Sequence, residues 1–363
     1  TAISIKPNYA EAYCNMGVMH QGEERLEDAI SYYEKAISIK PDYADAHLNR
    51  GFALLNKGEL KQGLDEYEWR LKRSKNSDLR RFSKPTWDGY TNLSDKKILL
   101  WSEQGPGDIV MWLSALQYLT PGAKHCIIEC PEKLLQLLKR SFPHVEVRVE
   151  NKKKCSEPDD FDLHLPIGSL FKQFLPEISS RKTVDAFLIP DPLRIEYWKK
   201  RLKTLGGGPF VGISWKSPLM TLPRLPNYTE TNDWKPVLSL PGITFINLQS
   251  KNFTEDILKI KNDFGVTIHN FDDLDHYDDL DDVAALAAAL DICVSVSTTV
   301  STITAAVGTP TKMLHWRQSS WNNILNTPPG PDVCVFERST WETWKEAFEA
   351  TAIDIKSFDK EKT

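Results

Sequence analysis

The chain repeats itself at an interval of 34 residues near its start. The segment Ala2–Pro7 recurs as Ala36–Pro41. The same interval relates six further pairs: Tyr9 and Tyr43, Ala12 and Ala46, Asn15 and Asn49, Gly17 and Gly51, Leu26 and Leu60, and Tyr33 and Tyr67. Units that recur at such a period stack on their neighbours, with small residues where two helices cross. We therefore expect helical hairpins here, the first with helices near residues 8–21 and 26–39.

The period of 34 and the proline that follows the second helix are typical of tetratricopeptide repeats. Because such hairpins bury their apolar faces only by stacking, two complete repeats predict either further repeats upstream or a cap from the next domain. One functional interpretation is a concave surface that holds a peptide or a partner protein. The alternative is a spacer or an oligomerisation element.

The length and composition of the chain exclude several classes of protein. With 363 residues it is long enough for two or three compact units. No apolar run approaches the roughly 20 residues that a membrane span needs, so we expect no such span. The net charge is -5 and the longest basic tracts are short, which disfavours nucleic acid as the main partner. We interpret those tracts, Lys152–Lys154 and Arg70–Arg81, as solvated linkers.

The cysteines and the N-terminus bear on localisation. The six cysteines form no Cys-x-x-Cys pair and no zinc-ligand spacing with histidine, so we expect buried free thiols rather than a disulfide or a metal site. The chain begins without a start methionine and without a signal-peptide pattern, which suggests that it is cut from a longer protein. A reducing compartment fits best, and we expect a cytoplasmic protein.

Beyond residue 95 short apolar strands alternate with helices in two successive sets. The first set is strand 97–101, helix 109–119, strand 126–130, helix 132–141, strand 145–149 and strand 163–165. The second set follows the flexible Gly206–Pro209: strands 210–215, 244–248 and 266–268, helix 280–290, strand 292–296, helix 299–307 and strand 312–315, with a last helix at 340–350. Such alternation gives mostly parallel sheets.

The predicted fold class is therefore α/β, with two Rossmann-like domains in a GT-B-like arrangement preceded by an all-α repeat segment. The expected boundaries are 1–73 for the repeats, 74–94 for a linker, 95–204 for the first Rossmann-like domain and 205–335 for the second. Residues 336–363 would form a C-terminal helix that packs back. Ligands in such sheets bind at the carboxyl ends of the strands.

Three loops at strand ends are candidates for chemistry. The loop Ser102–Asp108 has glycines that let a ligand approach the backbone, although Asp108 is also suited to capping the helix that follows. After the strand at 210–215, Lys216 and the nearby Arg224 suit a diphosphate, or are ordinary surface cations. The turn Ser295–Thr302 is rich in hydroxyls and is either a phosphate site or a plain helix cap.

The acidic segment Asp272–Asp282 lacks the ligand spacing and the glycine of a calcium loop. We interpret it as a solvated loop and helix start, since acids are favourable in the first turn of a helix. The histidines His125, His164 and His315 are interpreted as structural, and no metal site is expected.

In this order the motifs resemble the heptosyltransferase-like glycosyltransferases, especially bacterial tetratricopeptide proteins that carry such a module at their C-terminus. The resemblance covers nearly the whole chain. It rests on six segments: Pro85–Gly89, Trp101–Asp108, Leu165–Leu170, Val211–Ser217, Pro241–Gln249 and Asp291–Pro310.

The resemblance implies a metal-independent transferase with no cofactor and with a nucleoside diphosphate-sugar as substrate. Asp108 would be the general base for the acceptor hydroxyl, and Glu103, Gln104, Gly105 and Gly107 would form the acceptor loop. Donor binding would involve the following residues: Lys216, Ser217, Arg224, Gln249, Ser297, Thr298 and Thr299. The acceptor would be a glycan or a protein docked on the repeats.

One departure from the family pattern divides the hypotheses. Relatives usually show an Asp or Asn and then a His in the late turn, whereas this chain has Ser297 and Thr302. The first hypothesis is an active sugar transferase, which Asp108 and Lys216 favour. The second is a repeat scaffold whose transferase-like module is degenerate and only holds a ligand or a partner protein, which the altered turn favours.

Overall fold

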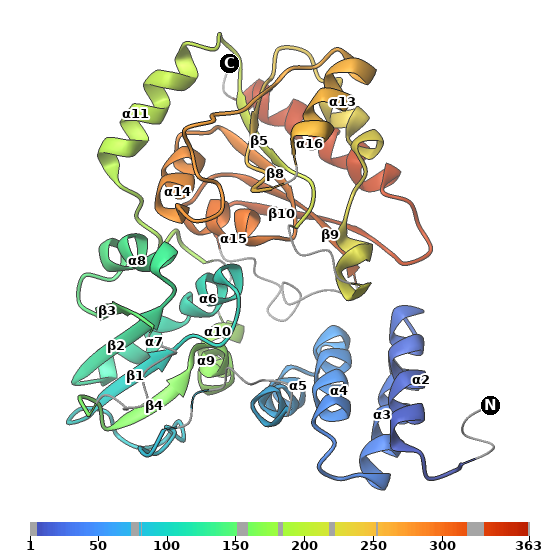
Figure 1. Ribbon diagram of the computed structural model, residues 1–363, viewed down its shortest axis with the longest axis vertical. Coiled ribbons are helices and arrows are strands. Elements are labelled where there is room, and N and C mark those ends of the chain that lie inside the picture. Colours follow the sequence, from blue (N-terminus) through green and yellow to red (C-terminus); the bar gives the residue numbers. More distant parts are fainter. Residues whose placement is uncertain are drawn as a thin grey trace.

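The computed structural model describes residues 6–73, 80, 82–150, 159–180, 184–217, 222–251, 253–317 and 330–361 (Figure 1). The repeat segment consists of α2 (Ala10–Gly22), α3 (Leu26–Ile39), α4 (Ala44–Lys57), α5 (Leu60–Tyr67) and the 3₁₀ turn η1 (Glu68–Lys72). At the first crossing, a Cβ on Gly17 would lie 2.5 Å from the ring of the fully buried Tyr33. The repeated glycine is therefore required by close helix packing, and the predicted hairpins are confirmed.

The first α/β domain contains a parallel four-stranded sheet in the order β3-β2-β1-β4. Its strands are β1 (Lys97–Trp101), β2 (His125–Cys130), β3 (Glu146–Val149) and β4 (Leu163–Pro166). Its helices are α6 (Pro106–Leu113), α7 (Leu116–Leu119), α8 (Leu135–Ser141), α9 (Leu170–Gln173) and α10 (Leu175–Ser180), with 3₁₀ turns η2 (Thr120–Gly122), η3 (Glu132–Leu134) and η4 (Ile167–Ser169).

The second α/β domain contains a parallel six-stranded sheet in the order β10-β9-β8-β5-β6-β7. Its strands are β5 (Phe210–Ser214), β6 (Thr244–Asn247), β7 (Ile268–His269), β8 (Ile292–Val296), β9 (Thr311–Trp316) and β10 (Val333–Arg338). Its helices are α11 (Pro192–Lys203), α12 (Lys235–Leu238), α13 (Thr254–Phe264), α14 (Leu280–Ala288), α15 (Thr299–Ala306) and α16 (Lys345–Glu361), with 3₁₀ turns η5 (Leu222–Asn227) and η6 (Thr231–Trp234).

The predicted fold class is confirmed, and the differences lie in single elements. The strand β10 and the helix α13 were not predicted, and α16 begins later and runs further than the predicted helix at 340–350. Helix α11 packs with the second domain, because its Trp198 lies in one apolar cluster with Leu286 of α14. By packing, the boundary between the two domains therefore falls before α11 rather than after residue 204.

The two α/β domains share one apolar core at their interface. Ile303 of α15 and Ala284 of α14 belong to the same cluster as Ile109 of α6. Arg140 of α8 also donates two hydrogen bonds to Asp281 at the start of α14, at 2.8 and 3.0 Å. Figure 1 shows α8 and α14 facing each other across the left end of this interface, with the repeat segment at the right. None of the described helices has both the length and the apolar character needed to cross a membrane.

Candidate functional site

Each parallel sheet has one point where the strand order reverses. In the first sheet it lies between β1 and β4, and in the second between β5 and β8, because the chain turns to opposite sides of β1 and of β5. Loops diverge at the carboxyl ends of such a strand pair and leave a crevice where ligands bind. The three candidate loops follow β1, β5 and β8, so the sequence motifs lie at these two switch points.

The first loop begins helix α6 without a side-chain cap from its N-cap residue. Gly105 is the N-cap in an extended conformation, and Pro106 occupies the first helical position. Asp108 is in the first turn, where a carboxylate is favourable to the helix dipole. Its Oδ2 lies 3.3 Å from where a Cβ on Gly105 would be, so the half-buried carboxylate turns back toward the loop. Both interpretations of Asp108, helix start and proton acceptor, are compatible with this position.

The acidic residue of the same loop is connected to the repeats. Glu103 Oε1 accepts hydrogen bonds from Arg70 Nη2 at 3.0 Å and from the Gly168 N–H at 3.1 Å. The next residue, Gln104, donates to the hydroxyl of Tyr67 at 2.6 Å. Arg70 and Tyr67 belong to the end of the second repeat, so the loop that carries the predicted acceptor residues is held from outside its own domain.

Arg70 is the centre of a buried charged network. It lies in η1 and also donates to Glu68 Oε1 at 2.5 Å and to Ser169 Oγ at 2.8 Å. Burial raises the pKa of Glu103, an effect that the charge of Arg70 opposes. Glu103 Oε2 is buried and has no hydrogen-bond partner among the described residues. The prediction that the basic tract at Arg70 is a solvated linker was wrong for this residue, which is 3% exposed.

At the second switch point, a neutral side chain organises the loop after β5. The Gln249 Oε1 accepts from the N–H groups of Trp215 and Lys216 at 3.0 and 3.1 Å, and its Nε2 donates to the Lys216 carbonyl at 2.7 Å. Gln249 is fully buried. Its side-chain amide therefore fixes the conformation of this loop, and its contact with a donor stays a prediction.

Lys216, the predicted diphosphate cation, forms an ion pair with Asp256 in the first turn of α13. Asp256 also accepts a hydrogen bond from Trp215 Nε1 at 2.8 Å. About a quarter of the Lys216 side chain is exposed, so it reaches solvent at the loop edge. The half-buried Ser217 ends this described segment, and the Arg224 side chain lies outside the described side chains, although its backbone belongs to η5.

The turn between β8 and α15 contains a reciprocal cap. The Thr298 hydroxyl accepts from the backbone of Ser301, and the Thr298 N–H donates to Ser301 Oγ at 3.0 Å. The Ser297 N–H donates to the carbonyl of Leu314 at 3.2 Å. Two N–H groups of the first turn, those of Thr299 and Val300, have no partner among the described residues. The hydroxyls therefore cap the helix, and these two N–H groups are among the donors that every helix start leaves unpaired within the helix.

The first and third loops meet across the domain interface. A Cβ on Gly107 would lie 3.0 Å from Thr299 Cα and 3.1 Å from its Oγ1. The N-terminal ends of α6 and α15 thus approach each other closely, and a side chain at position 107 would require Thr299 to shift by a few tenths of an ångström. Both ends carry partial positive charge, so their convergence favours an anion nearby. The glycine was a sequence prediction, but its contact with Thr299 was not.

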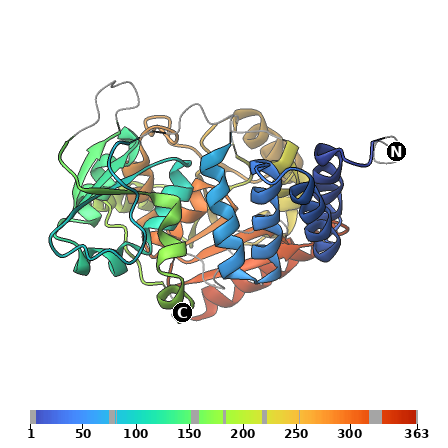
Figure 2. The ribbon, with the colours of Figure 1, turned by 90° about the horizontal axis from the view of Figure 1, so that it is seen from below.

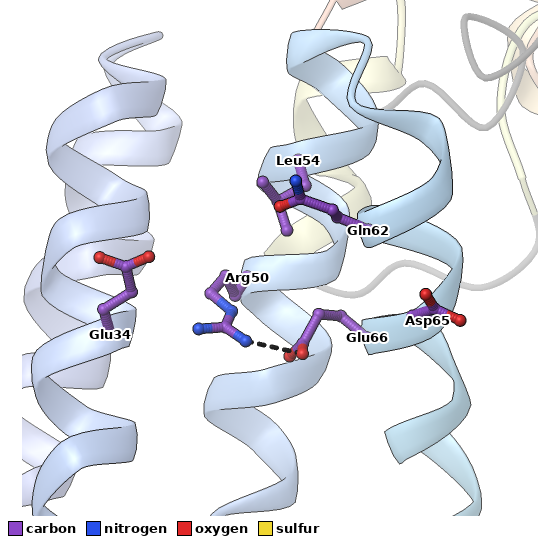
Figure 3. Close-up of a pocket in the computed structure, with 6 residues that line it drawn as sticks. All are labelled: Glu34, Arg50, Leu54, Gln62, Asp65 and Glu66. Atoms are coloured by element: carbon purple, nitrogen blue, oxygen red, sulfur yellow. Dashed lines mark hydrogen bonds and ion pairs between the residues drawn. The ribbon is translucent and has the colours of Figure 1, made fainter.

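A separate pocket of about 250 Å³ lies on the repeats, between α3 and the pair α4–α5 (Figure 3). Its lining is mostly polar and acidic: Glu34, Arg50, Leu54, Gln62, Asp65 and Glu66. Arg50 Nη2 donates to Glu66 Oε1 at 2.6 Å, the contact drawn as a dashed line. The pocket shows where the repeat surface is hollowed.

Within the described ranges, no three His, Cys, Asp or Glu side chains lie close enough together to hold a metal ion. Asp279 caps α14 by accepting from the Asp282 N–H at 3.0 Å, which confirms a helix start in the acidic segment. Asp282 itself departs from the expected solvated loop, because it is buried and accepts from Trp198 Nε1 at 2.7 Å.

The fully buried His315 has a pKa lowered to about 4 by desolvation.

Comparisons with known proteins agree with this architecture. A family model described as TPR repeat matches residues 23–58. The structure of a glycosyl transferase family 9 protein from Veillonella parvula is similar with a TM-score of 0.52 at 10% identity, over 69% of this chain and 88% of that one. The ADP-heptose lipopolysaccharide heptosyltransferase II of E. coli has a TM-score of 0.45 at 14% identity, over 72% of this chain and 99% of that one.

One curated protein is similar in sequence. FlbA of Caulobacter vibrioides is 34% identical over 317 residues, which cover 82% of this chain and 52% of FlbA. The chain therefore spans about half the length of this relative. Together these findings show tetratricopeptide repeats followed by two α/β domains with a GT-B-like fold.

Proposed function

We propose that this chain transfers a sugar from a nucleoside diphosphate-sugar to a hydroxyl of a glycan or protein acceptor. The observation that carries the proposal is the convergence of two helix N-termini, where Gly107 of α6 meets Thr299 of α15. The partial positive charge of both ends suits a diphosphate, which carries negative charge throughout and gains more as the sugar leaves. The fold that this chain shares with a glycosyl transferase family 9 protein supports the choice of a sugar donor.

In this proposal Asp108 takes the proton from the acceptor hydroxyl as its oxygen forms a bond to the anomeric carbon. The bond between that carbon and the diphosphate oxygen breaks, and the electron pair leaves with the diphosphate. Lys216 and the free N–H groups of Thr299 and Val300 stabilise the leaving group without a metal ion. Gln249 contributes by fixing the loop that presents Lys216. Ser217, Arg224, Ser297 and Thr298 stay predicted donor contacts, and Glu103, Gln104 and Gly105 stay predicted acceptor-loop residues.

The repeats supply the acceptor in this proposal. The pocket lined by Glu34, Asp65 and Glu66 has excess negative charge and would suit a basic side chain of a docked peptide. The end of the same repeat contacts the acceptor loop through Tyr67 and Arg70. A protein held on the repeats would therefore lie next to the loop that contains Asp108.

The first experiment measures binding of uridine, guanosine, cytidine and adenosine diphosphates and their sugars by calorimetry and thermal shift. We expect saturable binding of one nucleotide, weakened at least tenfold in Lys216→Ala. Gly107→Ala should also weaken binding because its Cβ would separate the two helix ends. Gly122→Ala is the matched control, since a Cβ there meets nothing within 4 Å. Absence of binding to all four nucleotides would contradict the proposal.

Turnover is tested next with the nucleotide that binds. Asp108→Asn should keep nucleotide affinity within about threefold and lower the transfer rate by about 100-fold or more, since a positioned base contributes roughly 10²–10⁴-fold. Equal loss of affinity and rate would instead assign Asp108 to the structure of the α6 helix start.

A second candidate function is a repeat scaffold whose GT-B module does not transfer sugars. Two observations favour it: Lys216 is already neutralised by Asp256, and the hydroxyls of Thr298 and Ser301 are used to cap α15. In that case the chain would bind a protein through its repeats and show no nucleotide-dependent transfer. Binding without turnover in the preceding experiments, together with retained capture of a basic peptide, would select this function.

A further inference from the structure

The two repeats end their first helices with the same turn but with different residues. Glu24 and Gly58 occupy equivalent positions, 34 residues apart. The backbone hydrogen bonds match as well: Glu24 N to Gln21 O at 3.0 Å and Arg25 N to His20 O at 3.0 Å, against Gly58 N to Leu55 O at 3.0 Å and Glu59 N to Leu54 O at 2.9 Å. The repeats therefore form an internal comparison at this position, with the same backbone turn and a different side chain.

That turn requires a left-handed backbone conformation. Gly58 has a φ of 90°, which glycine adopts freely. Glu24 has a φ of 61° and is the one non-glycine residue with positive φ in the described ranges. A glutamate is disfavoured in this conformation, whereas glycine is the usual residue at the end of a helix. A contact of its side chain would offset this backbone strain.

The Glu24 side chain provides such a contact with the second α/β domain. Its Oε1 accepts a hydrogen bond from the Thr340 N–H at 2.5 Å, just after β10. Its Oε2 lies 3.9 Å from Arg317 Nη1, just after β9. The carboxylate is largely buried, with 19% of the side chain exposed. Glu24 thus joins the first repeat to the carboxyl end of the second sheet.

The other end of the repeat segment contacts the first α/β domain. Arg70 and Tyr67 hold the loop that contains Glu103 and Gln104. Figure 2 shows the repeat helices next to both domains, and Figure 1 shows them on the side of the interface away from α8 and α14. The repeats therefore bridge the two α/β domains opposite the ion pair between Arg140 and Asp281.

We infer that Glu24 is a positioning residue, through which the repeat segment holds the second α/β domain and the start of α15 at a fixed place against the loop 102–108. The consequence for transfer rests on the proposed function, but the contact itself does not. Residues 6–73 then act as the second attachment between the domains, in addition to any role in docking a partner.

The contact is tested on the full chain by hydrogen exchange measured by mass spectrometry. In Glu24→Gly the turn is kept, because glycine suits its φ, so α2 and α3 stay protected. We expect exchange at Thr340 and in residues 339–344 to rise about tenfold, as a local opening. Glu24→Gln keeps an oxygen that accepts from Thr340, so exchange there should stay within about threefold of the wild type. Glu23→Gln, in the same turn, is the matched control and should leave it unchanged.

Two results would overturn the inference. Unchanged exchange at Thr340 in Glu24→Gly would mean that the Glu24 carboxylate does not protect the Thr340 amide in solution. Loss of protection throughout α2 and α3 would mean that Glu24 acts within its own repeat.

Transfer kinetics then separate the inference from the proposed function. If the wild type transfers sugar, Glu24→Gly should lower kcat about tenfold, because small errors in the relative placement of reacting groups are costly. Nucleotide affinity should stay within about threefold of the wild type. Glu24→Gln should have a kcat close to that of the wild type. An unaltered kcat would overturn the positioning role. If the wild type binds no nucleotide, the proposed function fails, and the exchange experiment still decides the contact of Glu24.

Discussion

The two switch points have the same strand topology but are built from different side chains. The first, between β1 and β4, is closed by a charged network, in which the buried side chains of Arg70 and Glu103 are joined by the half-buried Glu68. The second, between β5 and β8, is organised by the neutral Gln249 and by hydroxyls of the α15 cap, and its ion pair, Lys216 with Asp256, lies at the edge. Equivalent positions in two Rossmann-like sheets therefore differ in electrostatic character.

The difference indicates different tasks. Buried charges are expensive unless every partner is in place, so the network at Arg70 makes the first loop depend on the repeats. At the second point, the loop is fixed without charge, so the backbone donors of Thr299 and Val300 and the lysine at the edge are left to face an anion. In the proposed function, the first point would hold the architecture and the second would exchange a charged ligand.

The largest expected effect is at the first switch point. Replacing Arg70 by methionine leaves the carboxylates of Glu103 and Glu68 without their shared cation, and breaking a buried pair costs about 3–5 kcal/mol. We expect the free energy of unfolding, measured with denaturant, to fall by that amount. Arg73→Met is the control, because its pair with Asp45 is more than a third exposed and should contribute below about 1 kcal/mol. Similar values for both variants would refute the assignment of a buried network.

The next prediction uses titration, because the two domains should respond to pH in opposite directions. His315 of the second domain has a pKa lowered to about 4 by desolvation, with the charge of Glu337 opposing this. Between pH 6.5 and 4 the unfolded chain binds a proton that the native imidazole does not, so stability falls as pH falls, by on the order of 3 kcal/mol.

For Glu103 of the first domain the pKa is raised by burial, so stability falls as pH rises above the ordinary glutamate range. Thermal unfolding of the wild type, His315→Gln and Glu103→Gln across pH 4 to 7 checks both signs. His315→Gln should lose sensitivity at the acidic end and Glu103→Gln at the upper end. A change in the same direction for both variants would contradict the contrast between the domains.

A smaller effect is expected from the neutral residue of the second switch point. Gln249→Ala leaves the N–H groups of Trp215 and Lys216 and the Lys216 carbonyl without their partner, and an unpaired buried polar group costs about 1–3 kcal/mol. We expect a loss of about 2 kcal/mol in unfolding free energy, together with weaker nucleotide binding. Gln104→Ala is the comparison at the first loop, because it removes one contact with Tyr67. Equal losses would mean that Gln249 has no special part in shaping its loop.

The sequence predicted those features that depend on local pattern. The interval of 34 predicted the hairpins because Gly17 and Tyr33 must meet at a helix crossing, and apolar runs predicted the buried central strands. It misread Arg70 because the partners Glu103 and Ser169 lie 33 and 99 residues away, where no local pattern reveals them. It missed β10 although Val333–Phe336 is a short apolar run; this edge strand is half-buried along its length.

For the candidate site, the sequence located the loops but not the partners that define each side chain. Strand ends identified the segments at 102–108, 216–217 and 297–299. The neutralisation of Lys216 by Asp256 and the internal bonds of Gln249 arise from tertiary packing. The approach of Gly107 to Thr299 depends on how two domains meet, which neither segment encodes alone.

The smallest expected effect on stability decides whether the second switch point is built for exchange. The pair of Lys216 and Asp256 is about a quarter exposed on each side, so a double-mutant cycle with Lys216→Met and Asp256→Asn should give a coupling below about 1 kcal/mol. In nucleotide binding the single variants should act oppositely: Lys216→Met weakens it, and Asp256→Asn strengthens it a few-fold by leaving the ammonium uncompensated. A coupling of several kcal/mol with unchanged nucleotide affinity in both variants would make the pair structural, like Arg70 and Glu103. Both switch points would then contain a structural ion pair, and the argument that assigns ligand exchange to the second point would fail.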